Sequence, residues 1–114
     1  MTLPELLEPA VRTSGVAGAM VVSRDDGLLV AGTIRSQVNG SAVAALASRL
    51  AERVRVLAEA MGRAEPELIE LWGSEGTLLA APAGAGLLLV AVVSSGADPE
   101  PVRRELLRLT DKVA

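Results

Sequence analysis

The stretch 41–62 constrains the fold of this chain more than any other, because it has the pattern of one long amphipathic helix. Its apolar residues recur at steps of three and four, which is the period of a helical face. They are Val43, Leu46, Ala47, Leu50, Val54, Leu57, Ala58 and Met61. Asn39, Gly40 and Ser41 supply turn and N-cap residues before this stretch, and Gly62 stands where a left-handed residue ends many helices. We therefore predict a helix over 41–62 with this stripe against a sheet.

The second face of this helix mixes small residues with charged ones, although a helix on the surface of a sheet should be polar there. The small residues are Ala44, Ala45, Ala51, Val56 and Ala60, and the charged ones are Arg49, Glu52, Arg53, Arg55 and Glu59. One interpretation is that alanine is simply a good helix former. The other is that the helix contacts the sheet on one side and a partner, such as its own copy, on the other.

The composition excludes several classes of protein. At 114 residues, the chain has the size of a single domain, 1–114, with one core. It has no cysteine and no histidine, which argues against disulfides, imidazole bases and most zinc sites and fits a reducing cytoplasm. The net charge of −3 argues against a nucleic-acid partner. The N-terminus does not have the pattern of a secretory signal.

The pattern along the chain predicts the order helix, two strands, helix, three strands, helix. The strands are expected over 16–23, 28–34, 67–72, 77–81 and 87–94, and the outer helices over 3–12 and from Pro99 onward. The stretch 77–97 lacks charge, but Pro82 and two glycines divide it, so we predict two buried strands and no membrane segment. Because the innermost strands are apolar on both faces, we expect a three-layer α/β/α sandwich (α+β) with a five-stranded, mostly antiparallel sheet.

The strand 67–72 is the predicted edge of the sheet. Glu67 and Glu70 would discourage pairing with another chain, as charges on edge strands do. Its apolar residues, Leu68, Ile69, Leu71 and Trp72, favour such a contact. Trp72 has two interpretations, as an anchor of a protein contact or as a residue packed beneath the last helix.

No residue pattern points to catalysis, a metal or a cofactor. Asp25 and Asp26 form a carboxylate pair, but Asp25-Asp26-Gly27 is typical of a tight turn between two strands. Gly84-Ala85-Gly86 lacks the third glycine of a dinucleotide fingerprint. No histidine is present to activate a serine. The sequence therefore predicts a protein that is not an enzyme.

The order and spacing of several motifs resemble the roadblock (dynein light chain) family, and within it the bacterial members similar to the gliding-motility GTPase regulator. The motifs are the strand 15–23, the hairpin at Asp26-Gly27-Leu28-Leu29, the alanine-rich helix, the hairpin Glu70-Leu71-Trp72-Gly73 to Gly76-Thr77-Leu78-Leu79, and the apolar strand 87–93. The resemblance covers nearly the whole chain. Longin and profilin-like domains have related layouts.

The resemblance implies a cytoplasmic homodimer in which the third strands pair and the long helices lie side by side. The interface would then include Ala44, Ala51, Leu68, Ile69, Glu70, Leu71 and Trp72. It also implies that the paired helices offer Arg49, Glu52, Arg53 and Val56 to a small Ras-like GTPase and stimulate its nucleotide turnover, with no catalytic group of their own. The alternative is a purely structural dimerisation module, as in motor light chains, with no effect on nucleotide turnover.

Overall fold

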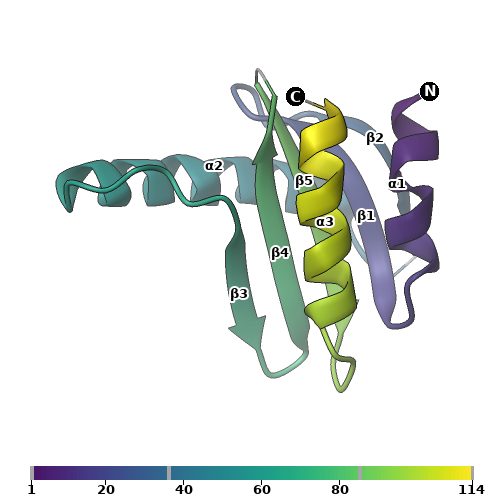
Figure 1. Cartoon of the computed structure of the whole chain (residues 1–114). Coiled ribbons are helices and arrows are strands. Elements are labelled where there is room, and N and C mark those ends of the chain that lie inside the picture. Colours follow the sequence, from purple (N-terminus) through teal and green to yellow (C-terminus); the bar gives the residue numbers. More distant parts are fainter. Residues whose placement is uncertain (1, 36, 85, 114) are drawn as a thin grey trace.

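The computed structural model describes residues 2–35, 37–84 and 86–113, and its elements follow the predicted order (Figure 1). The helices of these residues are α1 (Leu3–Arg12), α2 (Gly40–Ala60) and α3 (Glu100–Val113). The strands are β1 (Val16–Ser23), β2 (Leu29–Ile34), β3 (Ile69–Gly73), β4 (Gly76–Ala83) and β5 (Leu87–Ser94). Ser36 and Ala85, which the sequence placed in two connections, lie outside the described residues.

The sheet has the order β2-β1-β5-β4-β3, and every neighbouring pair in it is antiparallel. The two edges are therefore β2 and β3, which confirms the edge predicted for 67–72. The central strands β1 and β5 pair over almost their full length, from Val16 opposite Val93 to Ser23 opposite Leu87. Successive side chains of each strand point to opposite faces, so the apolar residues of β1 and β5 divide between two buried layers.

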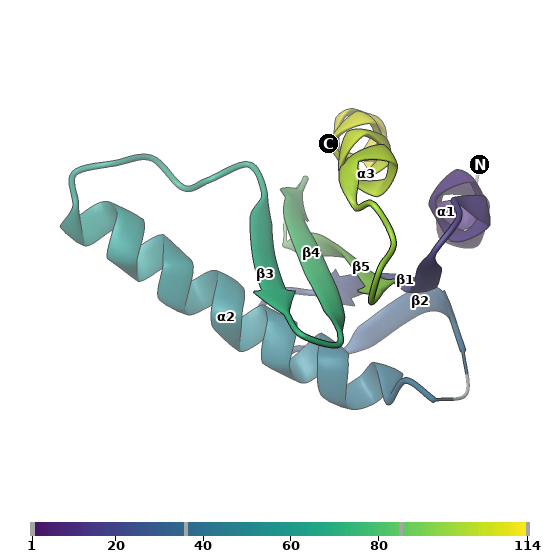
Figure 2. The same cartoon turned by 90° about the horizontal axis from the view of Figure 1, so that it is seen from below.

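Helices cover both faces of the sheet, which confirms the predicted three-layer sandwich. Figure 2 shows α1 and α3 on one side of the strands and α2 on the other. Large residues fill the α1/α3 layer, with Leu7, Val102, Leu106 and Leu109 packed on the sheet. The α2 layer brings three alanines, Ala44, Ala47 and Ala51, against the other face of the sheet.

The helices begin at the polar residues that the sequence offers as caps. The Thr2 hydroxyl accepts a hydrogen bond from Glu5 N at 3.3 Å, and the Asn39 side chain accepts one from Ala42 N at 3.1 Å. Asp98 accepts one from Glu100 N at 3.0 Å. Each cap satisfies an N–H group that has no partner within its helix.

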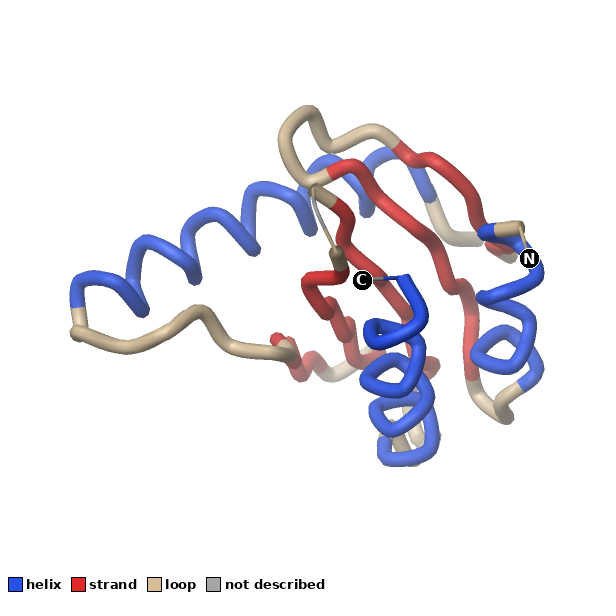
Figure 3. Tube along the Cα trace, turned by 45° about the horizontal axis from the view of Figure 1, so that its top comes forward, coloured by secondary structure: helices blue, strands red, loops and turns tan. Residues whose placement is uncertain are grey.

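The end of α2 is fixed by Gly62, whose φ of +70° places it in the left-handed region. Its N–H donates to Glu59 O at 3.0 Å, and Arg63 N donates to Ala58 O at 2.8 Å. These two bonds form a Schellman motif, which turns the chain sharply back. Figure 3 shows the following loop running from the helix end back toward the sheet.

Three predicted strands have bounds that are wrong by one or two residues, at the start of β2 and at both ends of β3 and β4. β2 begins at Leu29 and β3 at Ile69, one and two residues later than expected. β4 runs on to Ala83, through Pro82, where we expected a loop. The proline fits because β3 pairs with β4 only as far as Ala80, so position 82 has no neighbour on that side and the missing N–H breaks no inter-strand bond.

The lengths and hydropathy of the helices test whether any of them could span a membrane. No helix among the described residues is long and apolar enough to cross a bilayer. The apolar stretch 77–97, the one membrane candidate in the sequence, contains β4 and β5, as predicted.

Candidate functional site

The fully buried side of α2 carries only small residues, and the larger Val43 packs beside them, partly buried. Its buried residues are Ala44, Ala47, Ser48, Ala51 and Ala58. Because none of these side chains is large, the helix axis can lie close to the strands. Met20, Val22 and Leu88 of the sheet complete this layer.

The predicted placement of Ala44 and Ala51 on the outer side of this helix is therefore wrong. Their exposed fractions are 0% and 2%, so neither offers a surface to a second chain. Val43 and Ala47 of the predicted stripe do pack on the sheet. The helix is nevertheless rotated relative to our expectation, because Ala44 and Ala51 complete this contact and Leu46 and Leu57 lie outside it. Larger side chains at this contact would hold the helix away from the strands.

Three large apolar residues of the predicted stripe lie beside this contact and are exposed, whereas Leu50 and Val54 are partly buried. Leu46 is 62% exposed, Leu57 is 59% exposed and Met61, just after the helix, is 62% exposed. Figures 1 and 2 show the reason for the last two, since the C-terminal half of α2 extends beyond β3 and past the sheet. This half of the helix has no strand beneath it in its own subunit.

An apolar groove lies between the flank of α2 and the β3 side of the sheet. Its volume is about 290 Å³. It is lined by Val43, Leu46, Ala47, Leu50, Leu71 and Leu78. Leu71 is 56% exposed at the sheet edge, so the groove opens toward the free side of β3. We call these residues, together with Leu57 and Met61, the α2–β3 surface.

The β3 strand presents different residues to its two faces and to solvent. Leu68, just before the strand, packs on the α1/α3 layer, and Ile69 packs on the α2 layer. Trp72 is 63% exposed, and its indole Nε1 donates to Glu70 Oε2 at 3.0 Å. The alternative that Trp72 packs beneath the last helix is therefore wrong, and the indole lies at the open edge.

The charge of Glu70 is neutralised within the subunit. Its carboxylate forms an ion pair with Arg103 of α3 and also accepts the bond from Trp72. The hydrogen bond from Arg103, followed by that from Trp72, holds the pKa of Glu70 below its usual value against a raising effect of burial. The edge strand thus carries a carboxylate that is already paired, which weakens its protection against strand pairing.

The four residues predicted to contact a partner lie on one outward side of α2. Arg49, Glu52, Arg53 and Val56 are spaced by three and four residues, and all are exposed or partly exposed. Glu52 forms an ion pair with Arg55, whose hydrogen bond lowers the pKa of Glu52. Within the described part of the chain, Arg49 and Arg53 form no ion pair, so this side of the helix offers two unpaired positive charges.

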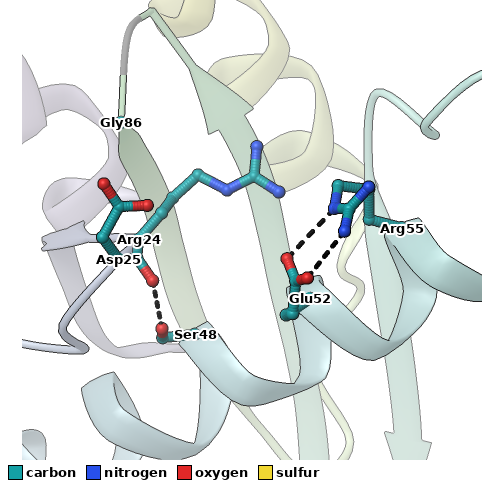
Figure 4. A pocket seen from close by; sticks show the side chains of 6 residues that line it. All are labelled: Arg24, Asp25, Ser48, Glu52, Arg55 and Gly86. Carbon is teal, nitrogen blue, oxygen red and sulfur yellow. Dashed lines mark hydrogen bonds and ion pairs between the residues drawn. The ribbon is translucent and has the colours of Figure 1, made fainter.

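A polar hollow of about 300 Å³ lies between α2 and the turn after β1 (Figure 4). Ser48 donates to the backbone carbonyl of Arg24, and the Glu52–Arg55 pair closes one side. The Arg24 guanidinium forms a two-bond ion pair with Glu65 of the loop that follows α2. The contacts around the hollow therefore hold the turn and the loop against α2. Both of its arginines, Arg24 and Arg55, form ion pairs with carboxylates of the same chain.

The turn that contains Asp25 and Asp26 is structural. The Asp26 carboxylate accepts a hydrogen bond from Leu28 N at 3.2 Å, as aspartate does in such turns. No group of three or more possible acidic metal ligands occurs in residues 2–35, 37–84 and 86–113.

The element order, the sheet and the long helix agree with one protein family. A family model described as the Roadblock/LC7 domain matches residues 2–93. The chain belongs to this family. No curated protein sequence matches this Roadblock/LC7 domain.

Solved structures have the same fold. A Roadblock/LC7 domain from Streptomyces avermitilis is 23% identical with a TM-score of 0.86, over 99% of this chain and 95% of that one. The gliding protein MglB from Thermus thermophilus is 24% identical with a TM-score of 0.84, over 96% and 84%. Myxococcus xanthus MglB is 17% identical with a TM-score of 0.79, over 96% and 79%. At these identities, the likeness shows the fold alone.

The residues that sequence reasoning missed are Leu46, Leu57 and Met61, which we expected against the sheet. A signal for them exists in the sequence. The apolar stripe and the set of alanines together are wider than one contact with a sheet requires, so one of the two had to remain outside. Side-chain size decides which, because the alanines allow the closer approach.

Proposed function

We propose that this Roadblock/LC7 domain is a homodimer that regulates or scaffolds a small Ras-like GTPase and has no catalytic activity of its own. The observation that carries the proposal is the α2–β3 surface. It places Leu46, Leu57, Met61 and Leu71 in solvent next to an unpaired strand. Contiguous apolar surface of this kind marks interaction sites in soluble proteins.

A second copy is the occupant that fits this surface best. Two β3 strands related by a two-fold axis would pair along their free edges, and each α2 would then extend over the partner's half of the combined sheet. The apolar groove and the overhanging end of α2 would be covered together. Burial of apolar area at about 25 cal/mol per Å² favours this pairing.

The side of α2 with Arg49, Glu52, Arg53 and Val56 would remain outward in such a dimer and supply the contact with the GTPase. Its two unpaired arginines suit an acidic partner surface. An exposed arginine can also stabilise charge during phosphoryl transfer. The resemblance to the gliding-motility GTPase regulator supports stimulation of the partner's own hydrolysis, and the same contact without stimulation would make the protein a structural module.

We further propose one domain over 1–114, a cytoplasmic location and no nucleic-acid partner. A single sheet that includes every strand supports the first, and the absence of cysteine fits the second. The net charge of −3 supports the third.

The dimer is tested by size-exclusion chromatography with light scattering. We expect a particle of about twice the 11.7 kDa chain mass. Leu57→Glu should yield monomers at micromolar concentration, because it places a charge in the proposed contact. Val56→Glu is the matched control, since this neighbouring residue faces outward and the dimer should persist. A wild-type protein that stays at one chain mass up to millimolar concentration would overturn the proposal.

Regulation is tested by single-turnover GTP hydrolysis with purified Ras-like GTPases from the same organism. We expect faster hydrolysis by one of them on adding the wild-type protein and loss of this effect with Arg49→Glu/Arg53→Glu. Arg104→Glu/Lys112→Glu on α3 makes the same change in charge and should leave the effect intact. Binding with unchanged hydrolysis would instead identify a structural module, and dimers that bind no Ras-like GTPase would refute the partner.

A further inference from the structure

The second edge of the sheet, β2, is as open as the first. All residues from Leu29 to Ile34 are at least partly exposed, and the strand contains neither a charge nor a proline. Leu28, just before the strand, is 62% exposed, and Val30, within it, is 50% exposed. Charges or prolines usually protect a free edge strand against pairing with another chain, and β2 has neither.

The layers of the sandwich extend to this edge. Figure 2 shows the N-terminal part of α2 beneath β2, where Ile34 packs on the α2 layer. The backbone groups of β2 that do not pair with β1 have no strand of the sheet beside them. Arg35 N donates to Ala17 O at 3.0 Å on the β1 side, so the alternation of an antiparallel strand turns the N–H and C=O groups of Gly32 and Ile34 outward.

The charges that flank β2 have opposite signs. Asp25 and Asp26 precede the strand, and the one arginine near them, Arg24, is paired with Glu65. Arg35 follows the strand, is exposed, and forms no ion pair with any other described residue. Two copies of β2 side by side in parallel would bring like charges together. In antiparallel orientation, each Arg35 lies near the acidic end of the other copy.

A shift of register divides the strand and sets the alignment. Val21 lies opposite Ala31 but Val22 lies opposite Leu29, so Val30 is an extra residue. The extra residue shifts the alternation of inward and outward backbone groups by one position. Outward backbone groups therefore occur at Gly32, after the bulge, and at Leu29, before it. An antiparallel alignment that places Gly32 opposite Leu29 of a second copy also brings Arg35 to the end of the partner strand that leads into the turn with Asp25 and Asp26.

We propose that β2 is a second self-association edge, at which two copies of this chain pair antiparallel with Arg35 of each near the acidic turn, Asp25 and Asp26, of the other. This goes beyond the proposed dimer, which uses the opposite edge. Since the two edges are independent, a chain paired at both would continue the sheet from subunit to subunit, and such an assembly does not close on itself. The bulge shortens the regular part of the pairing, so this contact is the weaker of the two.

The test uses a chain in which the α2–β3 surface is disabled by Leu57→Glu/Leu71→Glu, examined by sedimentation equilibrium from micromolar to millimolar concentration. We expect a monomer–dimer equilibrium. Arg35→Glu on this background should weaken the dimer at least about tenfold, because both ion pairs become repulsive. Lys112→Glu, the same change in charge on α3, should leave the dimer unchanged.

A mixing experiment separates loss of pairing from damage to the fold. On the same background, Arg35→Glu and Asp26→Arg should each be monomeric alone, yet form a mixed dimer, because their flanking charges are then complementary. Circular dichroism checks that Asp26→Arg keeps its turn, and Asp25→Arg replaces it otherwise.

Three results would overturn the proposal. They are a disabled chain that stays monomeric at millimolar concentration, a dimer that Arg35→Glu does not weaken, and folded charge variants that do not pair on mixing. The α2–β3 dimer would be rejected instead if Arg35→Glu alone converted the otherwise wild-type dimer to monomers. In that case Leu57→Glu/Leu71→Glu would leave the mass of the wild-type dimer unchanged.

Discussion

The two faces of the sheet are covered in different ways. On the α1/α3 face, large side chains such as Leu7, Leu106 and Leu109 fill the layer and are fully buried. On the α2 face, Ala44, Ala47 and Ala51 make the contact, and Leu46 and Leu57 of the helix remain in solvent. Both helical layers have ample apolar residues, but only the helices of the α1/α3 layer bury large side chains completely.

The difference teaches how one amphipathic helix can serve two surfaces. A contact built from alanine needs no large side chain, so the same helix keeps its leucines for a second surface. The α1/α3 layer supplies fold stability, and the α2 layer supplies exposed apolar area beside a free strand. Substitutions on the two faces should therefore act on different measurable quantities.

The largest effect is expected from matched leucine truncations on the two faces. Leu106→Ala should lower the free energy of unfolding by about 3 kcal/mol, because it leaves a cavity in a closed layer. Leu46→Ala should change it by less than about 0.5 kcal/mol in dilute solution, because this side chain is already exposed. Urea unfolding at one fixed low protein concentration measures both. Equal losses would show that the α2 flank is packed within the subunit.

A smaller effect is expected from enlarging an alanine under α2. Ala51→Leu should destabilise the chain by about 2 kcal/mol, because the helix lies too close to the sheet for a larger side chain. Ala60→Leu, on the exposed end of the same helix, is the control and should stay within about 0.5 kcal/mol of the wild type. Thermal unfolding of the two variants compares them directly. If Ala51→Leu left the free energy of unfolding unchanged, the contact between α2 and the sheet would have room for a larger side chain.

The smallest effect concerns the ion pair that ties β3 to the α3 face. The hydrogen bond from Arg103 lowers the pKa of Glu70 in the folded chain. The contribution of the ion pair to the free energy of unfolding is therefore complete above a pH of about 4.5 and is lost as the pH falls through the lowered pKa. We expect Glu70→Gln to cost about 0.5 kcal/mol at pH 7 and nothing at the acid end. Urea titrations at several pH values give the difference. Glu75→Gln controls for net charge, and a cost that does not change with pH would exclude the ion pair as its cause.

The sequence was sufficient for the order of elements because each has a local signal. Thr2, Asn39 and Asp98 cap the three helices, and Gly62 ends the longest one with a positive φ. The periods of apolar residues then separate helix from strand. The family resemblance rested on these same local features, and the match over residues 2–93 confirms it.

The rotation of α2 could not be predicted in the same way. Periodicity locates an apolar stripe, but Ala44 and Ala51 count as apolar on either face, so the pattern does not say which side meets the strands. The continuation of β4 through Pro82 also depended on tertiary structure, because β3 ends its pairing at Ala80. The exposed position of Trp72 depended on where α3 comes to lie over the sheet.

The half of α2 that projects past its own sheet has a consequence for the life of a newly made chain. A few helical turns without tertiary support are only marginally stable in water, so this projecting segment should fray and re-form in a solitary subunit. Proteases and chaperones act on such openings. The proposed dimer would cover this segment, so a solitary subunit would be the form most open to proteolysis.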